Sequence, residues 1–352
     1  MMAPRPSLAR SLLRLGVLVS ATVATAALAI PAHALVIVPT FDTAWTTAAP
    51  PGATTDVTNV INEFQGLFKN TGTVHIEFDW GNVAGSPLRA GPLGLNTLGA
   101  EVYPQDVCCY PNDPNQYSLD ATKTMLMNHS AAHPENTALA TAVTHLPAAY
   151  PCGTCINQPP TFFIPDAQYI AVNNGAAQNG DPVHAYVGAA IRPDWDFTGG
   201  QPGAGKFDFT SVIEHEVSHA LGRADDGLGG PNFLMILDFY KYYPCAPGTL
   251  NPGPVKSCFS IDGGTTGLHT FDDASDTSDW VTSGPSGDSF NAGLAPGEKG
   301  IITPVDITEM NALGWDPAAS VPEPGTLLLF GTVLFGLAPL RRRRGSRLSR
   351  LG

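Results

Sequence analysis

The chain has 352 residues, of which 37 are Gly and 32 are Pro, and this excess of helix-breaking residues excludes a coiled coil or a plain helix bundle. Hydrophobic residues make up 43% and charged residues 14%, which excludes a disordered chain and suffices for a buried core. The net charge of −13 is unevenly distributed, because residues 35–320 hold nine Lys and Arg against 30 Asp and Glu, a balance of −21. Phosphate binding needs a basic surface, so this balance argues against nucleic acid as a partner.

The first 34 residues have the three parts of a secretory signal peptide. Basic residues are followed by an apolar run over 15–30 and by a small-x-small cleavage site that ends at Ala34. The apolar run has about 16 residues and is shorter than the ~20 that a membrane-spanning helix needs. We therefore expect a signal peptide at 1–34 and a mature chain that begins at Leu35.

Hydrophobic periodicity predicts both helices and strands in the region that follows. Apolar residues three and four apart predict an amphipathic helix from Asp56 to Phe68, with Asp56 as its N-cap. After Gly72, strict alternation predicts a half-exposed strand, with Asp79 on its polar face. Further helices are expected at 119–130 and 136–145, further strands at 168–172 and 183–191, and a Pro- and Gly-rich connection at 192–206.

Residues 207–225 carry the motif on which the functional prediction depends. Their apolar spacing predicts a helix, capped by Asp208, Thr210 or Ser211, that contains His215-Glu216-Val217-Ser218-His219. Two histidines four residues apart lie on one helix face and can bind a single Zn²⁺, while the intervening glutamate can contact the metal's water without being a ligand. Gly222 follows where it can end the helix, and Asp225 completes the pattern HExxHxxGxxD.

This pattern resembles that of the metzincin metallopeptidases, in which a glycine turn leads from HExxH to a third metal ligand. The resemblance implies that His215, His219 and Asp225 bind one Zn²⁺, with the adjacent Asp226 as the alternative third ligand. It also implies that Glu216 is the general base for a water that attacks the scissile carbonyl.

The same resemblance implies an α/β fold of the zincin (metzincin) type. Its catalytic domain would have a twisted mixed sheet, the active-site helix, a subdomain break near residue 222 and a loop-rich C-terminal subdomain. Metzincins also have a methionine turn beneath the metal, for which Met235 is the candidate, although a Met in an apolar run is equally compatible with plain core. Tyr240, Tyr242 and Tyr243 are the candidates for a tyrosine that binds the oxyanion or the metal.

Six cysteines lie between the two ends of the chain, an even number that permits up to three disulfides in an oxidising compartment. Cys245 and Cys258 bracket a short loop rich in Pro and Gly and are the preferred pair. Cys152 and Cys155 form a CxxC motif without a thioredoxin-like pattern around it, so a structural bridge is favoured over a redox role. The remaining two are Cys108 and Cys109.

Downstream of the motif, several aspartates can supply oxygen ligands for Ca²⁺. They are Asp262, Asp272, Asp273, Asp276 and Asp279. Their spacing does not match an EF-hand loop, so acidic surface loops are the favoured interpretation.

The histidines outside the motif, at positions 75, 129, 133, 145, 184 and 269, are interpreted as ordinary core or surface residues. A short helix is expected to begin at Pro304, with Thr303 as its cap, and to end at Gly314.

The end of the chain resembles the PEP-CTERM sorting signal of Gram-negative bacteria. Val321-Pro322-Glu323-Pro324 is followed by an apolar segment over 325–340 and by the run Arg341-Arg342-Arg343-Arg344. The resemblance implies recognition by an exosortase, cleavage near the Pro-Glu-Pro, and delivery to the cell envelope, the cell surface or the exterior. A simple C-terminal membrane anchor is the alternative, and either way the tail makes the membrane contact before processing.

The sequence therefore predicts a signal peptide at 1–34, a metallopeptidase domain at 35–320 and a sorting segment at 321–352. We expect an exported zinc-dependent endopeptidase that acts on protein or peptide substrates. The first alternative is a non-catalytic cell-surface or extracellular-matrix protein with a structural or degenerate zinc site. A zinc hydrolase that acts on a non-peptide amide is the second.

Overall fold

The computed structural model describes residues 35–88, 100–104, 115–150, 161–178, 180–225, 233–251, 255–282 and 287–318. All of them belong to one unit, His33–Gly352, which is distinct from Met1–Ala32. The expected signal peptide, the sorting segment, Asp226, Cys108, Cys109, Cys152 and Cys155 lie outside the described residues.

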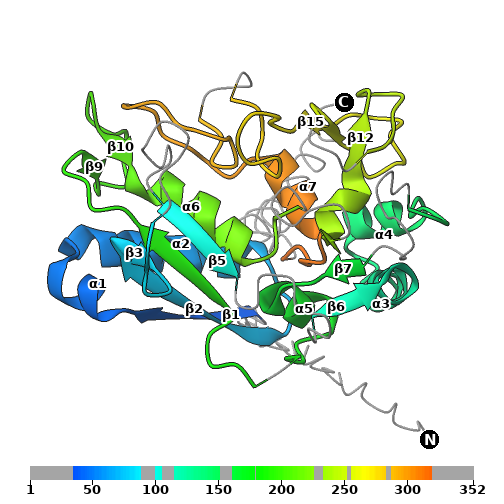
Figure 1. Ribbon diagram of the computed structural model, residues 1–352, viewed down its shortest axis with the longest axis horizontal. Helices are drawn as coiled ribbons and strands as arrows, with labels where there is room; N and C mark the ends of the chain where they lie inside the picture. Colours follow the sequence, from blue (N-terminus) through cyan, green and yellow to red (C-terminus); the bar gives the residue numbers. More distant parts are fainter. Residues whose placement is uncertain are drawn as a thin grey trace, which may run out of the picture. The chain divides into compact units, whose positions relative to one another are not determined.

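A four-stranded mixed sheet with the order β1-β2-β8-β5 forms the N-terminal part of the fold (Figure 1). Its strands are β1 (Leu35–Phe41), β2 (Gly72–Trp80), β8 (Ala185–Ala189) and β5 (Ala100–Pro104). The first three are parallel, and β5 pairs with β8 in the antiparallel direction at one edge. The alternation along β2 buries Val74, Ile76 and Phe78, as predicted, and the predicted strand at 183–191 is present as β8.

Two helices, α2 (Pro51–Leu67) and α6 (Phe209–Ala220), pack against each other, and α6 also contacts β5 and β8. The helix predicted from Asp56 is present but begins at Pro51, where a proline at the first helical position costs no hydrogen bond. The prediction of Asp56 as N-cap is therefore wrong, because this residue lies inside α2 and is buried.

An aromatic cluster fixes the start of α6 over the sheet. The ring of Phe209 lies 6.1 Å from that of Trp80 and 6.4 Å from that of Trp45, centroid to centroid. Trp45 in turn lies 6.0 Å from Phe78 of β2. All four side chains are buried, so this cluster sets the height of the motif-bearing helix above the sheet.

The other helices are α1 (Thr43–Ala48), α3 (Leu119–Ala132), α4 (Thr137–Val143), α5 (Asp166–Val172) and α7 (Pro304–Ala312). α3 and α4 confirm the helices predicted at 119–130 and 136–145. The strand predicted at 168–172 is wrong, since these residues form α5, which follows Pro165 and has Asp166 in its first turn. Five apolar-rich residues fit a buried strand or a buried helix equally well, and periodicity alone cannot separate the two.

Short strands and loops make up much of the remaining chain. The strands are β3 (Asn82–Val83), β4 (Ser86–Pro87), β6 (Gln116–Ser118), β7 (Thr161–Phe163), β9 (Trp195–Asp196), β10 (Phe207–Asp208), β11 (Phe233–Leu234), β12 (Lys241–Tyr243), β13 (Thr249–Leu250), β14 (Cys258–Phe259) and β15 (His269–Thr270), and a 3₁₀ helix, η2, spans Ile236–Tyr240. Cys245 and Cys258 lie at disulfide-bonding distance, with Cα atoms 5.2 Å apart.

The C-terminal helix α7 follows its predicted capping. The Thr303 hydroxyl accepts from the Asp306 N–H, and the Asp306 carboxylate accepts from the Thr303 N–H. Beyond the helix, Gly314 has a φ of +106°, and the Trp315 indole N–H donates to the Leu221 carbonyl at the end of α6, 2.9 Å away. This contact ties the end of the motif-bearing helix to the C-terminal segment.

Asp79 of β2 is buried, although the alternation of the sequence predicts it on a half-exposed polar face. One carboxylate oxygen accepts from the Ala84 N–H, at 2.6 Å, in the turn between β3 and β4. Burial, reinforced by Asp42 and Glu77, raises the pKa of Asp79 to about 6, although the hydrogen bond from Ala84 opposes the shift. The folded protein therefore binds this proton more tightly than the unfolded chain does.

We expect Asp79→Asn to gain stability relative to wild type as pH rises from 4 to 6. A raised folded-state pKa stabilises the protein below the unfolded pKa, and this contribution is lost as pH rises through the folded pKa. Thermal unfolding at pH 4, 5, 6 and 7 measures the effect. Asp194→Asn is the control, because the hydrogen bond from Arg192 lowers the pKa of Asp194, so its contribution changes below pH 4 and stays nearly constant over the range measured. A constant difference between Asp79→Asn and wild type over this range would contradict the assignment.

Candidate metal centre

The helix α6 carries His215, Glu216 and His219 and is buried along nearly its whole length. The two histidines lie one turn apart on the same face, with ring centroids 4.6 Å apart. After Ala220 the chain turns at Gly222, whose φ of +101° a residue with a Cβ adopts only with strain. The predicted helix and its glycine end are thus confirmed.

Backbone carbonyls fix the orientation of both imidazoles. His215 Nδ1 lies 2.9 Å from the Ser289 carbonyl oxygen, and His219 Nδ1 contacts the Arg223 carbonyl oxygen. A carbonyl only accepts, so Nδ1 of each ring carries a proton and in the neutral ring Nε2 has the lone pair, which at His219 faces Arg223 Nη2. This arrangement of an outer hydrogen bond and a free ring nitrogen is typical of metal-binding histidines.

Asp279 completes a group of three convergent ligand atoms. Its Oδ1 lies 3.3 Å from His215 Nε2 and 3.1 Å from His219 Nε2, and the two Nε2 atoms are 2.9 Å apart. Two ligands that are each ~2.0–2.1 Å from a tetrahedral zinc ion lie about 3.3 Å from each other. The three side chains therefore have the chemistry and nearly the spacing of a three-ligand zinc site.

Arg223 lies beside this group with its guanidinium fully buried. It donates to the Ser218 hydroxyl at 2.7 Å, to the Ser278 carbonyl at 2.8 Å and to Asp279 Oδ1 at 3.0 Å. A further nitrogen, Nη2, lies 2.9 Å from His219 Nε2. For His219 Nε2 to bind a metal, Arg223 Nη2 has to move away from it. The hydrogen bonds to Ser218, Ser278 and Asp279 can hold Arg223 in place.

Asp225, the third ligand expected from the motif, has other contacts in this structure. Its Oδ2 accepts from Lys241 Nζ and from the Thr277 hydroxyl, the latter at 2.6 Å. Lys241 is fully buried, and a buried ammonium needs a carboxylate nearby. The structure thus places Asp279, and not Asp225, against the two imidazoles.

The surroundings of the site shift the pKa values of several of its residues. Burial lowers the pKa of His215 to about 3, so its imidazole is neutral and available as a ligand. Burial would raise the pKa of Asp279, but the buried Arg223 guanidinium holds it below its usual range, and the carboxylate is ionised. Burial and Arg223 act to lower the pKa of His219, but Asp279 and Asp276 outweigh them and raise it. Burial, helped by Asp279 and Asp276 and opposed by His219 and Arg223, raises the pKa of Glu216 to about 8.

The other residues expected near the metal have varied positions. Met235 is buried and precedes η2, where its N–H donates to the Asp238 carboxylate at 2.7 Å. The Tyr240 hydroxyl donates to the Ala312 carbonyl at 2.9 Å, which directs it toward α7. Tyr242 is buried in β12, and Tyr243 is exposed.

Three of the aspartates that could supply oxygen ligands for Ca²⁺ make local hydrogen bonds. Asp262 accepts from the Ser260 hydroxyl, Asp272 from the Ser275 N–H and Asp276 from the Ser278 hydroxyl. Among the described residues, these three do not belong to a group of metal-ligand atoms. Asp279 differs from them because it joins the two histidines.

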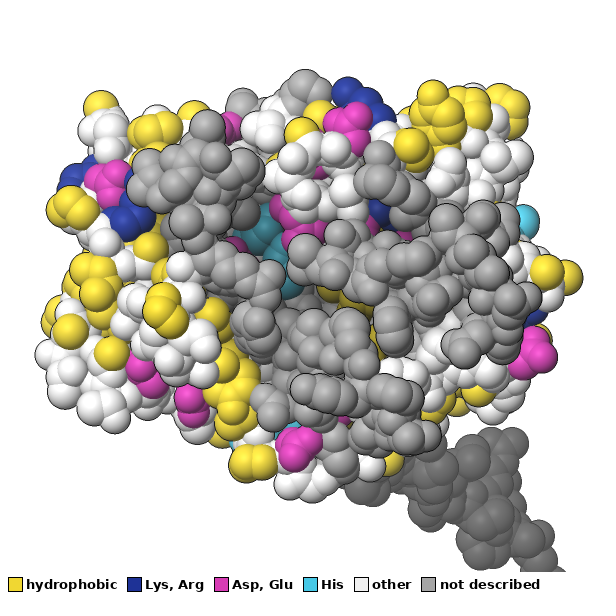
Figure 2. Space-filling model, viewed as in Figure 1, with side chains coloured by type: hydrophobic (Ala, Val, Ile, Leu, Met, Phe, Trp, Pro, Cys, Tyr) yellow, Lys and Arg dark blue, Asp and Glu magenta, His cyan; other side chains and the backbone are white. Residues whose placement is uncertain are grey.

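Two residues of this centre were not predicted as parts of it. The sequence points to Asp279 only as an oxygen ligand for Ca²⁺, and the motif assigns no role to Arg223, although this residue stands inside it. The contacts of both depend on the fold, which brings residues 278–279 and 289 to the end of α6. Figure 2 shows histidine side chains beside acidic ones in a hollow of the face that it presents, over the C-terminal half of α6.

Comparison with known families matches residues 320–344 to the PEP-CTERM protein-sorting motif. This motif indicates an exported bacterial protein that exosortase sorting machinery recognises. No curated protein and no solved structure matches the chain. Within the described ranges, no helix is both long and apolar enough to cross a membrane.

Proposed function

We propose that this exported protein is a zinc-dependent peptidase of the zincin type, with His215, His219 and Asp279 as metal ligands and Glu216 as general base. The observation that carries the proposal is the convergence of three acceptor atoms, two Nε2 lone pairs and one carboxylate oxygen, within 3.3 Å of one another. Arg223 donates to Asp279 Oδ1 and faces His219 Nε2, and a zinc ion among the three atoms would take the place of the contact with His219. In this proposal the third ligand is Asp279, and not Asp225 as the motif implies.

The donor set suits zinc and leaves a position for water. Two imidazoles and one carboxylate are the ligand types found in catalytic zinc sites, and structural sites more often use four protein ligands, usually cysteines. When bound in such a site, zinc lowers the pKa of a water molecule and polarises a carbonyl. The carboxylate of Asp279 and the fixed tautomers of the histidines hold the ligand atoms ready for the ion.

Glu216 is positioned to move the proton. It follows the first ligand on α6, and its carboxylate is buried beside His219 and Asp279. Its pKa of about 8 would be drawn downward by a nearby dication, toward the ionised form that a base needs. As base, Glu216 takes a proton from the attacking water and then donates it to the leaving amine.

Cleavage of general protein and peptide substrates tests the proposal. We would incubate the full-length chain with casein and with a mixed peptide library, and identify cleavage products by mass spectrometry. The proposal predicts peptide-bond cleavage that a zinc chelator abolishes and that added zinc restores. Zinc-loaded protein that cleaves no peptide would instead favour a surface protein with a structural zinc site.

A further inference from the structure

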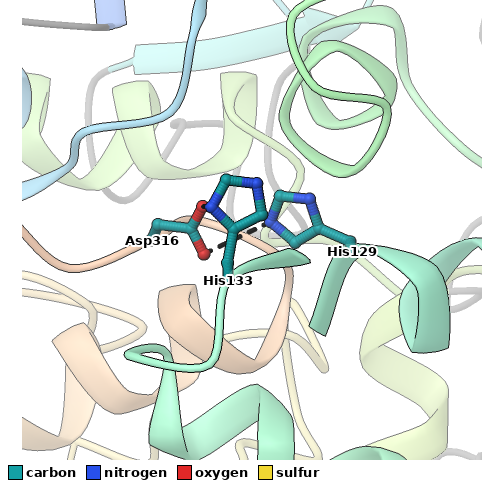
Figure 3. Close-up of side chains that lie close together, drawn as sticks. All are labelled: His129, His133 and Asp316. Carbon is teal, nitrogen blue, oxygen red and sulfur yellow. Dashed lines mark hydrogen bonds and ion pairs between the residues drawn. The ribbon is translucent and has the colours of Figure 1, made fainter. Parts of the chain in front are cut away.

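A second pair of histidines four residues apart occurs in the chain. His129 belongs to the last turn of α3, and His133 follows directly after that helix. Their rings stack with centroids 4.3 Å apart and planes inclined by 27°. Figure 3 shows both rings directed toward the carboxylate of Asp316, which lies just beyond α7.

The three side chains have the spacing of metal ligands. His129 Nε2 lies 3.2 Å from Asp316 Oδ1, and His133 Nδ1 lies 2.9 Å from Asp316 Oδ2. One ligand atom of each residue lies within 4.8 Å of the others, as in the group at His215. The expected separation between two ligands of a tetrahedral zinc ion is about 3.3 Å.

A buried carboxylate oxygen of this group lacks a hydrogen-bond donor among the described residues. His133 Nε2 lies 2.9 Å from the side-chain oxygen of Asn174, which only accepts, so Nε2 carries the proton. The other ring nitrogen, Nδ1, lies 2.9 Å from Asp316 Oδ2. This oxygen is buried and receives no hydrogen bond from any described residue.

The carboxylate is held rigidly by the rest of the fold. The Asn136 side-chain amide donates to Asp316 Oδ1 at 3.1 Å, and the Asp316 N–H donates to the Asn70 side-chain oxygen at 2.6 Å. The Asp316 carbonyl accepts from the Lys69 N–H at 3.0 Å. Asp316 is therefore fixed relative to α3 before any ion binds, which lowers the entropic cost of binding.

One side of the group is open. His129 and Asp316 are 1% and 0% exposed, but His133 is 25% exposed and provides a path for an ion to enter. Glu135 lies on this open side, with its Oε1 3.6 Å from His133 Nδ1 and 2.7 Å from Lys69 Nζ.

We propose that His129, His133 and Asp316 form a second zinc site, separate from the one on α6. Two imidazoles and one carboxylate favour zinc over Ca²⁺ or Mg²⁺, which prefer oxygen ligands alone. An ion at this site would link the C-terminal end of α3 to the segment that follows α7. It shares no residue with the proposed peptidase centre, and the two proposals can fail independently.

The direct test is the zinc stoichiometry of the full-length chain, measured by native mass spectrometry after zinc loading and removal of excess metal. We expect two zinc ions per chain in wild type. His133→Gln should retain one ion, because Gln cannot supply the imidazole lone pair. His145→Gln, which changes an exposed histidine elsewhere, should retain two.

A second measurement uses thermal unfolding in the background His215→Ala/His219→Ala. Zinc should still raise the melting temperature of this variant, and adding His133→Gln should remove that rise. Equal zinc contents in wild type, His133→Gln and His145→Gln would overturn the proposal, and so would an unchanged zinc-dependent rise in melting temperature after His133→Gln is added to the double-alanine background. In either case the group would be a hydrogen-bonded pair in which a proton on His133 takes the place of the metal.

Discussion

Glu216→Gln should bind zinc as wild type does and hydrolyse peptides about 10²–10⁴-fold more slowly, the usual contribution of a positioned general base. The substitution keeps the shape of the side chain and removes its ability to accept a proton. Because Glu216 is not among the convergent ligand atoms, zinc content should not change. Initial rates on a cleavable peptide, together with zinc per chain, measure both quantities.

A neighbouring glutamate provides the matched control for this substitution. Glu214 lies two residues earlier on the same buried helix, and its carboxylate accepts from the Ser289 hydroxyl. Glu214→Gln makes the same chemical change without removing the proposed base, so hydrolysis should persist. Equal rates in Glu216→Gln and wild type would exclude Glu216 as the base, whatever the metal content.

The second large effect concerns zinc affinity, and it decides whether Asp279 or Asp225 is the third ligand. Asp279→Asn should weaken zinc binding at the α6 site by at least about 100-fold, because loss of a ligand should exceed the 10–100-fold effects of outer-shell substitutions. Asp225→Asn should leave this affinity unchanged. Competition with a chromophoric zinc chelator measures both variants under the same conditions.

The ion pair between Asp225 and Lys241 predicts that Asp225→Asn loses stability and keeps its zinc affinity. In Asp225→Asn, the buried Lys241 keeps its charge without a carboxylate partner, and breaking a buried ion pair in this way costs about 3–5 kcal/mol. Denaturant unfolding should therefore show a large loss of stability with zinc affinity intact. Zinc loss in Asp225→Asn combined with retention in Asp279→Asn would restore the ligand set implied by the motif.

The parts of the site that sequence could predict are local in the chain. The spacing of His215, Glu216 and His219 on one helix follows from helical geometry, and Gly222 ends that helix as expected. The helix α7 was predictable for the same reason, since Thr303 and Asp306 cap it within four residues.

The contacts that sequence could not predict are long-range. Asp279 reaches the histidines only because the chain between them returns to the end of α6, where Arg223 and Ser289 also contribute. The pattern HExxHxxGxxD points to Asp225 as the third metal ligand. It does not show that this carboxylate contacts the buried Lys241. His129 and His133 had the spacing of the motif histidines, and only the fold brings Asp316 to them.

Anomalous diffraction at the zinc edge, from crystals of the zinc-loaded protein, tests the central claim most directly. The account predicts a zinc peak about 2.0–2.2 Å from His215 Nε2, from His219 Nε2 and from a carboxylate oxygen of Asp279, with the remaining position held by water. Glu216 should lie within hydrogen-bonding distance of that water. A metal-free site on α6 in zinc-loaded crystals, or an ion there with four protein ligands and no water, would contradict a catalytic zinc centre.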